Sequence, residues 1–124
     1  MNTVEITGLG HALFTEAGDG LFLYEPDNEQ LVDINPMAER LIGLAREDIM
    51  RSPATYWFRH GGNGGGGNEN LRRAGQQTIS FHGQDGFLLR TSQEGVWVPV
   101  NVTVSRLHVQ PKTLSLITFR DVRD

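Results

Sequence analysis

Residues 30–43 constrain the fold most strongly, because they specify a strand that turns directly into a short helix. The first part, residues 31–34, is a short apolar strand. Asn35 can cap the helix by accepting a hydrogen bond from a first-turn N–H, and Pro36 suits the first helical position, where its missing N–H would be unsatisfied anyway. Gly43 allows the left-handed backbone at which helices commonly end. The segment therefore predicts a tight strand–helix corner with no long connector.

The longest strand signal is an alternation of valines along residues 96–105. Valine occupies positions 96, 98, 100, 102 and 104, and the intervening positions include Trp97, Asn101 and Thr103. A period of two places the two sets on opposite faces of a strand, so we expect the valine row to face a core. Pro99 cannot donate a hydrogen bond to a neighbouring strand, and we expect that neighbour to end or bulge beside it.

Shorter apolar segments complete the expected sheet. The five expected strands span residues 21–24, 31–34, 87–91, 96–105 and 113–119. The first two are joined by a turn at residues 25–29 that contains Pro, Asp and Asn, which predicts an antiparallel hairpin. The result is an α+β domain, a five-stranded antiparallel sheet with short helices on one face. Residues 1–18 are interpreted as a lead-in with a short helix at residues 11–16.

Size and charge exclude several classes of protein. A chain of 124 residues forms one domain with a single core. Its 11 basic and 15 acidic residues give a net charge of -4, and no Lys/Arg cluster offers a phosphate-binding surface, so we expect no nucleic-acid partner. We find no apolar run of membrane-spanning length and no signal peptide. The expected location is therefore cytoplasmic, without membrane contact by this segment.

Cysteine and glycine usage narrows the chemistry further. The chain has no cysteine, which excludes disulfides, thiolate metal sites and cysteine nucleophiles. A glycine-rich segment at residues 61–68 is not followed by the Lys-Ser/Thr pair that a phosphate-binding loop needs. We interpret it as a flexible loop. No nucleophile-elbow pattern accompanies the serines, so we expect no catalytic residues.

Two groups of motifs together resemble a PAS domain. Residues 19–21 read Asp-Gly-Leu at the head of the first strand, and residues 35–43 read NPMAERLIG. The second motif differs from the usual PAS pattern Asn-Pro-Ala-Ala-Glu-Arg-Leu-Leu-Gly only at Met37 and Ile42. The C-terminal half matches as well, through residues 95–105 and through Phe-Arg-Asp-Val at residues 119–122. The resemblance covers residues 19–122.

The resemblance implies a role as well as a fold. It implies a sensory or signal-relay input domain of the kind found in bacterial sensor histidine kinases, dimeric and without enzymatic activity of its own. In such relatives an Asp-Ile/Val-Thr motif joins the last strand to an output helix. Asp121 and Val122 match that signal junction, whereas Arg123 replaces the threonine. Relatives that form a flavin–cysteine adduct are excluded, because this chain has no cysteine.

His60 is the one candidate for a haem ligand. In haem-binding PAS sensors the ligand is a histidine at the start of the long connecting helix, and His60 lies near the corresponding place. Many PAS sequences without haem have a histidine there too, and the glycines that follow disfavour a rigid helix, so a surface or capping role is the main interpretation. His11, His82 and His108 lack metal-ligand spacing, and we expect no metal site.

One set of apolar residues is expected on the concave face of the sheet, where it would line either a filled core or a cavity for an apolar small molecule. The set is Leu21, Leu23, Ile34, Leu41, Trp57, Leu71, Leu89, Val98, Val100, Val102 and Ile117. Trp97 lies on the opposite face, where it contacts either a dimer mate or the residues before Gly18. Two hypotheses follow: a ligand-responsive sensor, or a ligand-free dimerisation module.

Overall fold

The computed structural model describes residues 3–60, 81–83, 87–108 and 113–122. The helical segments are α1 (Thr3–Glu16), α2 (Pro36–Ile42), α3 (Arg46–Ile49) and the 3-10 turn η1 (Ala54–Trp57). The strands are β1 (Gly20–Tyr24), β2 (Leu31–Ile34), β3 (Phe58–His60), β4 (Phe81–Gly83), β5 (Phe87–Arg90), β6 (Trp97–His108) and β7 (Thr113–Asp121). The predicted loop at residues 61–68 lies outside the described residues.

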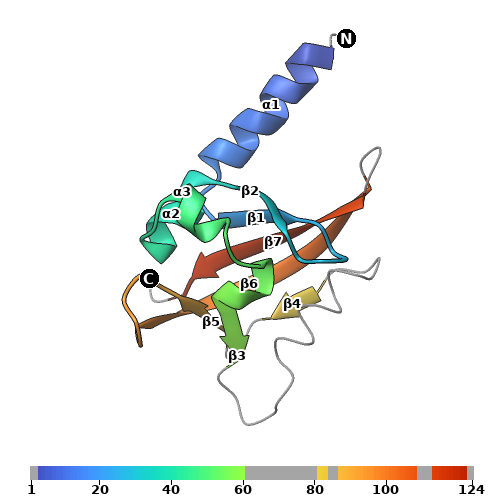
Figure 1. Ribbon diagram of the computed structural model, residues 1–124. Coiled ribbons are helices and arrows are strands. Elements are labelled where there is room, and N and C mark those ends of the chain that lie inside the picture. Colours follow the sequence, from blue (N-terminus) through green and yellow to red (C-terminus); the bar gives the residue numbers. More distant parts are fainter. Residues whose placement is uncertain (1–2, 61–80, 84–86, 109–112, 123–124) are drawn as a thin grey trace.

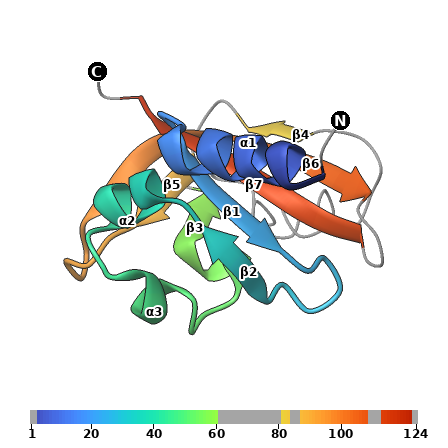
Figure 2. The ribbon, with the colours of Figure 1, turned by 90° about the horizontal axis from the view of Figure 1, so that it is seen from above.

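All strands form one antiparallel sheet in the order β2-β1-β7-β6-β5-β3, and β4 pairs with β6 next to β5 (Figure 1). Helices α2 and α3 lie on one side of this sheet (Figure 2). Within the described part of the chain the sheet has seven strands, which corrects the predicted number of five. The two additional strands, β3 and β4, have three residues each, which is too short to produce a recognisable alternation.

Strand β6 confirms the predicted valine face, with one correction. Val98, Val100, Val102 and Val104 are buried in the core. Val96 is 44% exposed, because it precedes the start of β6 and belongs to the turn before it. The valine row therefore begins one step later than the sequence pattern predicts.

Pro99 fits into β6 because the neighbouring strand ends beside it. Asp121 is the last residue of β7 and lies opposite Val100. The next residue, Val122, donates its backbone N–H to the Pro99 carbonyl oxygen at 3.2 Å. The nitrogen of Pro99 therefore faces the end of β7, where no ladder hydrogen bond is lost, and the expectation drawn from the sequence is confirmed.

Aromatic rings fill the centre of the core. Phe22, Phe58 and Phe119 contact one another edge to face, with ring centroids 5.0 to 5.7 Å apart. Gly20 is the partner of Phe119 in the β1–β7 ladder, and the Phe119 ring occupies the space that a Cβ at position 20 would need. Glycine is therefore required at position 20 by close packing.

The predicted core-facing residues of β1 were wrong by one position. Phe22 and Tyr24 face the core, whereas Leu21 and Leu23 lie half-buried on the other face. Since every residue in 21–24 is apolar or aromatic, the sequence of this strand has no polar position to mark its outer face. The other predicted residues that the structure describes are buried: Ile34, Trp57, Leu89, Val98, Val100, Val102 and Ile117. Leu41 is half-buried and packs against the core, and Leu71 lies outside the described residues.

Helix α1 is longer than predicted and projects from the body of the domain (Figure 1). The sequence indicated a helix only at residues 11–16, because Gly8 and Gly10 are poor helix formers. Its C-terminal end meets α2, and Leu13 is 65% exposed. Among the described residues, no helix is both long and apolar enough to cross a membrane.

Candidate functional site

Asn35 joins three elements of the structure through its side chain. Its Oδ1 atom accepts hydrogen bonds from the backbone N–H of Ala38 at 3.1 Å and of Leu21 at 2.8 Å. Its Nδ2 group donates to the carbonyl oxygens of Phe14 at 3.1 Å and Asp19 at 2.9 Å. The carboxamide is fully buried and uses its whole hydrogen-bonding capacity. The predicted helix cap is therefore confirmed, and the same side chain also links α1 and β1.

The two other predicted features of α2, a proline at its start and a glycine at its end, are also present. Pro36 occupies the first turn, and Gly43 ends the helix with a φ of 85°. The left-handed backbone at Gly43 is one that glycine adopts without steric cost. Helix α2 is thus fixed at both ends, by Asn35 at the start and by Gly43 at the end.

The start of β1 and the end of β7 lie together beside α2. Asp19 precedes β1, Arg120 is near the end of β7, and their side chains form an ion pair with Nε and Oδ1 2.9 Å apart. The hydrogen bond and charge of Asp19 raise the pKa of Arg120, which is positively charged in any case. An open groove at this place is lined by Met37, Leu41 and Val122, among others. We call the contacts of Asn35 together with the Asp19–Arg120 pair the terminal junction.

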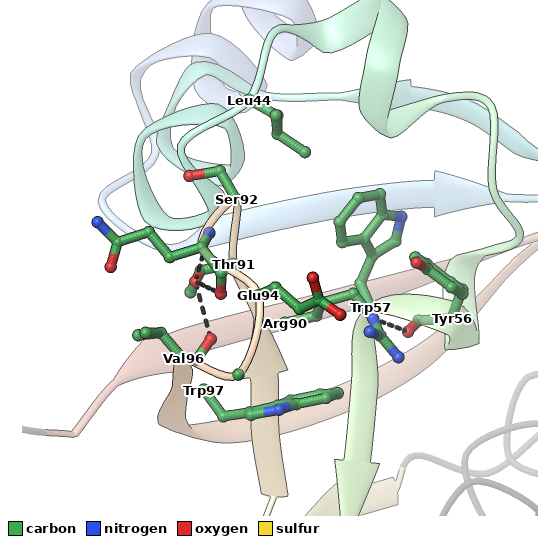
Figure 3. Close-up of a pocket in the computed structure, with 11 residues that line it drawn as sticks. Leu44, Tyr56, Trp57, Arg90, Thr91, Ser92, Glu94, Val96 and Trp97 are labelled. Carbon is green, nitrogen blue, oxygen red and sulfur yellow. Dashed lines mark hydrogen bonds between the residues drawn. The ribbon is translucent and has the colours of Figure 1, made fainter.

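A second site is a solvent-open pocket of about 240 Å³ between η1 and the turn that joins β5 to β6 (Figure 3). We call it the turn pocket. Tyr56 and Trp57 of η1 lie on one side of it, and residues 91–96 of the turn lie on the other. Leu44, Arg90 and Trp97 complete the lining.

Hydrogen bonds give the turn beside this pocket a defined shape. The Thr91 hydroxyl donates to the Val96 carbonyl oxygen at 2.8 Å, and the Val96 N–H donates to the Gln93 carbonyl oxygen at 3.0 Å. The Ser92 N–H donates to the carbonyl oxygen of Ile42 at 2.8 Å. The turn is therefore attached to the last residue of α2, whose first turn is held by Asn35.

Two arginines stack on one tryptophan next to the turn pocket. The Cζ atom of Arg59 lies 4.2 Å from the centroid of the Trp97 ring, and that of Arg90 lies 4.6 Å from it. Arg90 also lies 4.2 Å from the centroid of Tyr56 and donates from Nε to the Tyr56 carbonyl oxygen at 3.2 Å. These contacts stabilise the side chains by cation–π interaction.

The core contains one polar cluster, where the β1–β2 turn meets η1. The Thr55 hydroxyl donates to the buried carboxylate of Glu29, whose backbone has a φ of 62°. The backbone N–H of Ala54 donates to the Glu29 carbonyl oxygen at 2.9 Å. Burial raises the pKa of the Tyr24 phenol well above its ordinary value, and the Glu29 charge adds to this, while Ser115 acts in the opposite direction. Tyr24 is therefore neutral at physiological pH.

The structure brings some of the predicted site residues into contact and separates others. Asn35 and Asp121 lie near the terminal junction, whereas Trp97 contacts arginines of its own chain. His60 ends β3, where its backbone pairs with Phe87, and the residues that follow lie outside the described part of the chain. Within residues 3–60, 81–83, 87–108 and 113–122, no group of three His, Cys, Asp or Glu side chains could hold a metal ion.

Sequence reasoning named Trp57 and Trp97 but did not place them in one pocket, and it missed the other residues of the turn pocket. Arg90 and Glu94 show no motif, and Arg90 comes to lie beside Trp97 only because β5 and β6 pair. The clearest available signal was Trp97, a large aromatic residue on the polar face of a strand, for which the sequence left open a contact with a dimer mate or with the residues before Gly18.

An antiparallel sheet in this order, with α2, α3 and η1 on its core face, is the PAS fold. The chain belongs to the PAS domain family, whose profile matches residues 18–124. The resemblance and the α+β PAS fold expected from the sequence are thus confirmed. A comparison with curated protein sequences finds no match.

Several solved PAS domains have a similar structure at low sequence identity. The PAS domain of nitrogen regulation protein NR(II) from Vibrio parahaemolyticus has a TM-score of 0.71 at 18% identity, over 92% of this chain and 98% of that chain. A domain of a sensory box sensor histidine kinase/response regulator from Geobacter sulfurreducens has a TM-score of 0.72 at 18% identity, covering 94% and 96%. The PAS domain of the fruit-fly ELK potassium channel has a TM-score of 0.74 at 10% identity, with full coverage of both chains.

Proposed function

We propose that this PAS domain is a cytoplasmic, non-enzymatic input domain that controls an effector module, and that the effector is a sensor histidine kinase. Two similar solved structures come from a sensor histidine kinase/response regulator and from a two-component sensor histidine kinase. The motif resemblance of the sequence points to the same class. The proposal for this chain is that a small ligand or a change in dimer geometry sets the kinase output.

The fully satisfied carboxamide of Asn35 is the observation that carries this proposal. It connects the end of α1 to β1 and to the start of α2, while Asp19 connects the start of β1 to the end of β7. A displacement of α2 would therefore change the hydrogen bonds that Asn35 makes to α1 and to the start of β1. Because Asp19 also pairs with Arg120, the change would extend to the end of β7. Since the turn pocket is attached to the other end of α2 through Ser92, occupancy of the pocket can affect the terminal junction.

A kinase chimera tests this role. The PAS domain of a sensor histidine kinase is replaced by this chain, and autophosphorylation is measured for the wild-type sequence and for Asp19→Asn. The substitution breaks the exposed ion pair with Arg120 and leaves the core intact, so the proposal expects kinase output to change by about fivefold or more. Asp27→Asn, the same exchange at an exposed position of the β1–β2 turn, serves as the control and should leave output unchanged. Equal output for wild type and Asp19→Asn would reject the terminal junction as the signal path.

A ligand-free dimerisation module is the second candidate, and the exposure of α1 favours it. Leu13 is 65% exposed on a helix that projects from the domain. An apolar side chain in this position can bury its surface against a second copy of the helix. The test is sedimentation equilibrium of the chain with Leu13→Glu, with His11→Glu on the same helix as control. A dimer that persists unchanged in Leu13→Glu would exclude this face.

A further inference from the structure

One arginine in the turn pocket and one beside it have no ion-pair partner among the described residues. Arg59 and Arg90 both stack on Trp97, and neither forms an ion pair within the part of the chain that the structure describes. Three other arginines each have an aspartate partner: Arg46 with Asp33, Arg51 with Asp48, and Arg120 with Asp19. Two guanidinium groups lie on one indole, and Glu94 in the pocket lining supplies a single negative charge against them, so the local potential is positive on a chain whose net charge is negative.

The geometry of Arg90 suits it to bind a carboxylate. Its Nε–H is already used by the Tyr56 carbonyl oxygen, and its plane is held by the rings of Tyr56 and Trp97. Its two Nη nitrogens donate to no described residue. A guanidinium fixed in this way presents a planar pair of donors that matches the two oxygens of a carboxylate. Because the side chain is already ordered, little conformational entropy is lost on binding.

The remaining walls of the pocket combine polar residues of the turn with a few apolar side chains, and the volume is small. Leu44, Trp57 and Val96 lie around it, and Val96 is largely exposed to solvent. A volume of about 240 Å³ corresponds to about eight water molecules at about 30 Å³ each, which is the size of a single-ring molecule. Displacement of water from these side chains by a ring would favour binding.

We propose that the turn pocket binds a small aromatic monocarboxylate. Arg90 pairs with the carboxylate, Arg59 adds to the positive potential, and the ring lies against Leu44, Trp57 and Val96. The inference rests on the sensory role proposed above and names the chemical class of its signal. This site is separate from the valine face of β6, which is part of the core.

Glu94 sets the charge that the ligand can carry. Its side chain extends from the β5–β6 turn toward the η1 side of the pocket (Figure 3). A carboxylate at this place repels a second negative charge, so a ligand with one carboxylate binds better than a dicarboxylate. Replacement of Glu94 by glutamine removes this repulsion and keeps the shape of the side chain.

Isothermal titration calorimetry on the 124-residue chain tests the proposal with three probes. Benzoate supplies both ring and charge, benzamide supplies the ring without the charge, and acetate supplies the charge without the ring. We expect benzoate to bind about tenfold or more tightly than either of the other two, since a charge-assisted bidentate pair contributes at that level. Benzoate that binds no more tightly than benzamide would overturn the proposal.

Substitutions of single residues test whether benzoate binds in the turn pocket. Arg90→Gln should remove the preference for benzoate over benzamide, and Glu94→Gln should strengthen benzoate binding about two- to fivefold. Arg46→Gln is the matched control, because Arg46 pairs with Asp33 outside the pocket, and it should leave binding unchanged. If Arg90→Gln does not fold, Arg90→Lys keeps the charge without the planar fork and should lose most of the preference. A preference that survives in Arg90→Lys or Arg90→Gln would overturn the assignment.

The ligand site and the signal path are tested by different measurements, so one can be rejected without the other. If benzoate does not bind but Asp19→Asn changes the output of the kinase chimera, only the ligand assignment is overturned. If benzoate binds through Arg90 but Asp19→Asn does not change the kinase output of the chimera, the signal path is rejected and the ligand site is supported.

Discussion

Strand β6 contributes to two regions of opposite character, the valine face of the core and the turn pocket at its first residue. Val98, Val100 and Val102 lie among aromatic and aliphatic side chains, where a charge would have no partner. Trp97 points to the other face, where two arginines stack on it in contact with solvent. The two faces have different roles. The core face determines whether the domain folds, and the groups around Trp97 at the start of β6 offer positive charge and hydrogen-bond donors that a ligand can recognise.

The largest effect is expected in the core. Val100 is 2% exposed, so Val100→Asp places an unpaired carboxylate among apolar side chains and should lower the free energy of unfolding by about 4 kcal/mol or more. Asn101→Asp, one residue further along β6 and exposed, should change it little. Thermal unfolding followed by circular dichroism gives the comparison. A Val100→Asp variant that melts like the wild type would show that the valine face is not buried.

The next largest effect on stability is expected at Asn35, which belongs to neither region. It caps α2, the helix to which the turn beside the pocket is attached. Asn35→Asp keeps Oδ1 as an acceptor for the cap and places a second oxygen against the carbonyls of Phe14 and Asp19. Two buried donors are lost, and we expect a destabilisation of about 3 kcal/mol in urea unfolding. Asp27→Asn, at an exposed position of the β1–β2 turn, is the control for a carboxylate–amide exchange. Similar midpoints for Asn35→Asp and the wild type would mean that the donated bonds contribute nothing.

A smaller, pH-dependent effect is expected at Tyr24. Burial raises the pKa of this phenol in the folded state above that in the unfolded state. Its contribution to stability is therefore complete below pH of about 10 and is lost as the pH rises toward the folded-state value, by up to about 1.4 kcal/mol per pH unit. Tyr24→Phe should flatten the alkaline decline in unfolding free energy, while Tyr56→Phe, at an exposed position, should leave it unchanged. An equally steep decline in Tyr24→Phe would assign the effect to another group.

The smallest effect on stability is expected in the turn pocket. Trp97→Ala removes two cation–π contacts at a partly exposed site and should lower the free energy of unfolding by about 1 kcal/mol. Chemical denaturation gives this value, and Trp97→Phe, which keeps a ring, should lose less. A loss as large as that of Val100→Asp would end the distinction between the two regions. The dimer role that the sequence suggested for Trp97 stays a prediction, which sedimentation of Trp97→Ala also checks.

The parts of the fold that the sequence predicted correctly are those with a strong local signal. The valine alternation of β6 and the Asn35–Pro36 cap each specify their structure within a few residues. The orientation of β1 could not be derived, because Leu21 and Phe22 are both apolar and only tertiary packing decides which one faces inward. The turn pocket could not be derived from local patterns, since it brings residues 57, 90 and 97 together through tertiary contacts and strand pairing.

The contact between Gly20 and the Phe119 ring has a consequence for the alignment of the first strand. A slip of β1 by one residue against β7 would bring the Cβ of Asp19 or Leu21 into the space that the ring fills, and it would also separate Asp19 from Arg120. Position 20 must lack a side chain, and position 19 must carry a carboxylate. Together these two requirements allow only one alignment of β1 against β7. An insertion of one residue within β1 should therefore prevent native assembly. Replacement of Gly18 by alanine should be accepted, because a Cβ at that position would meet no atom within 4 Å.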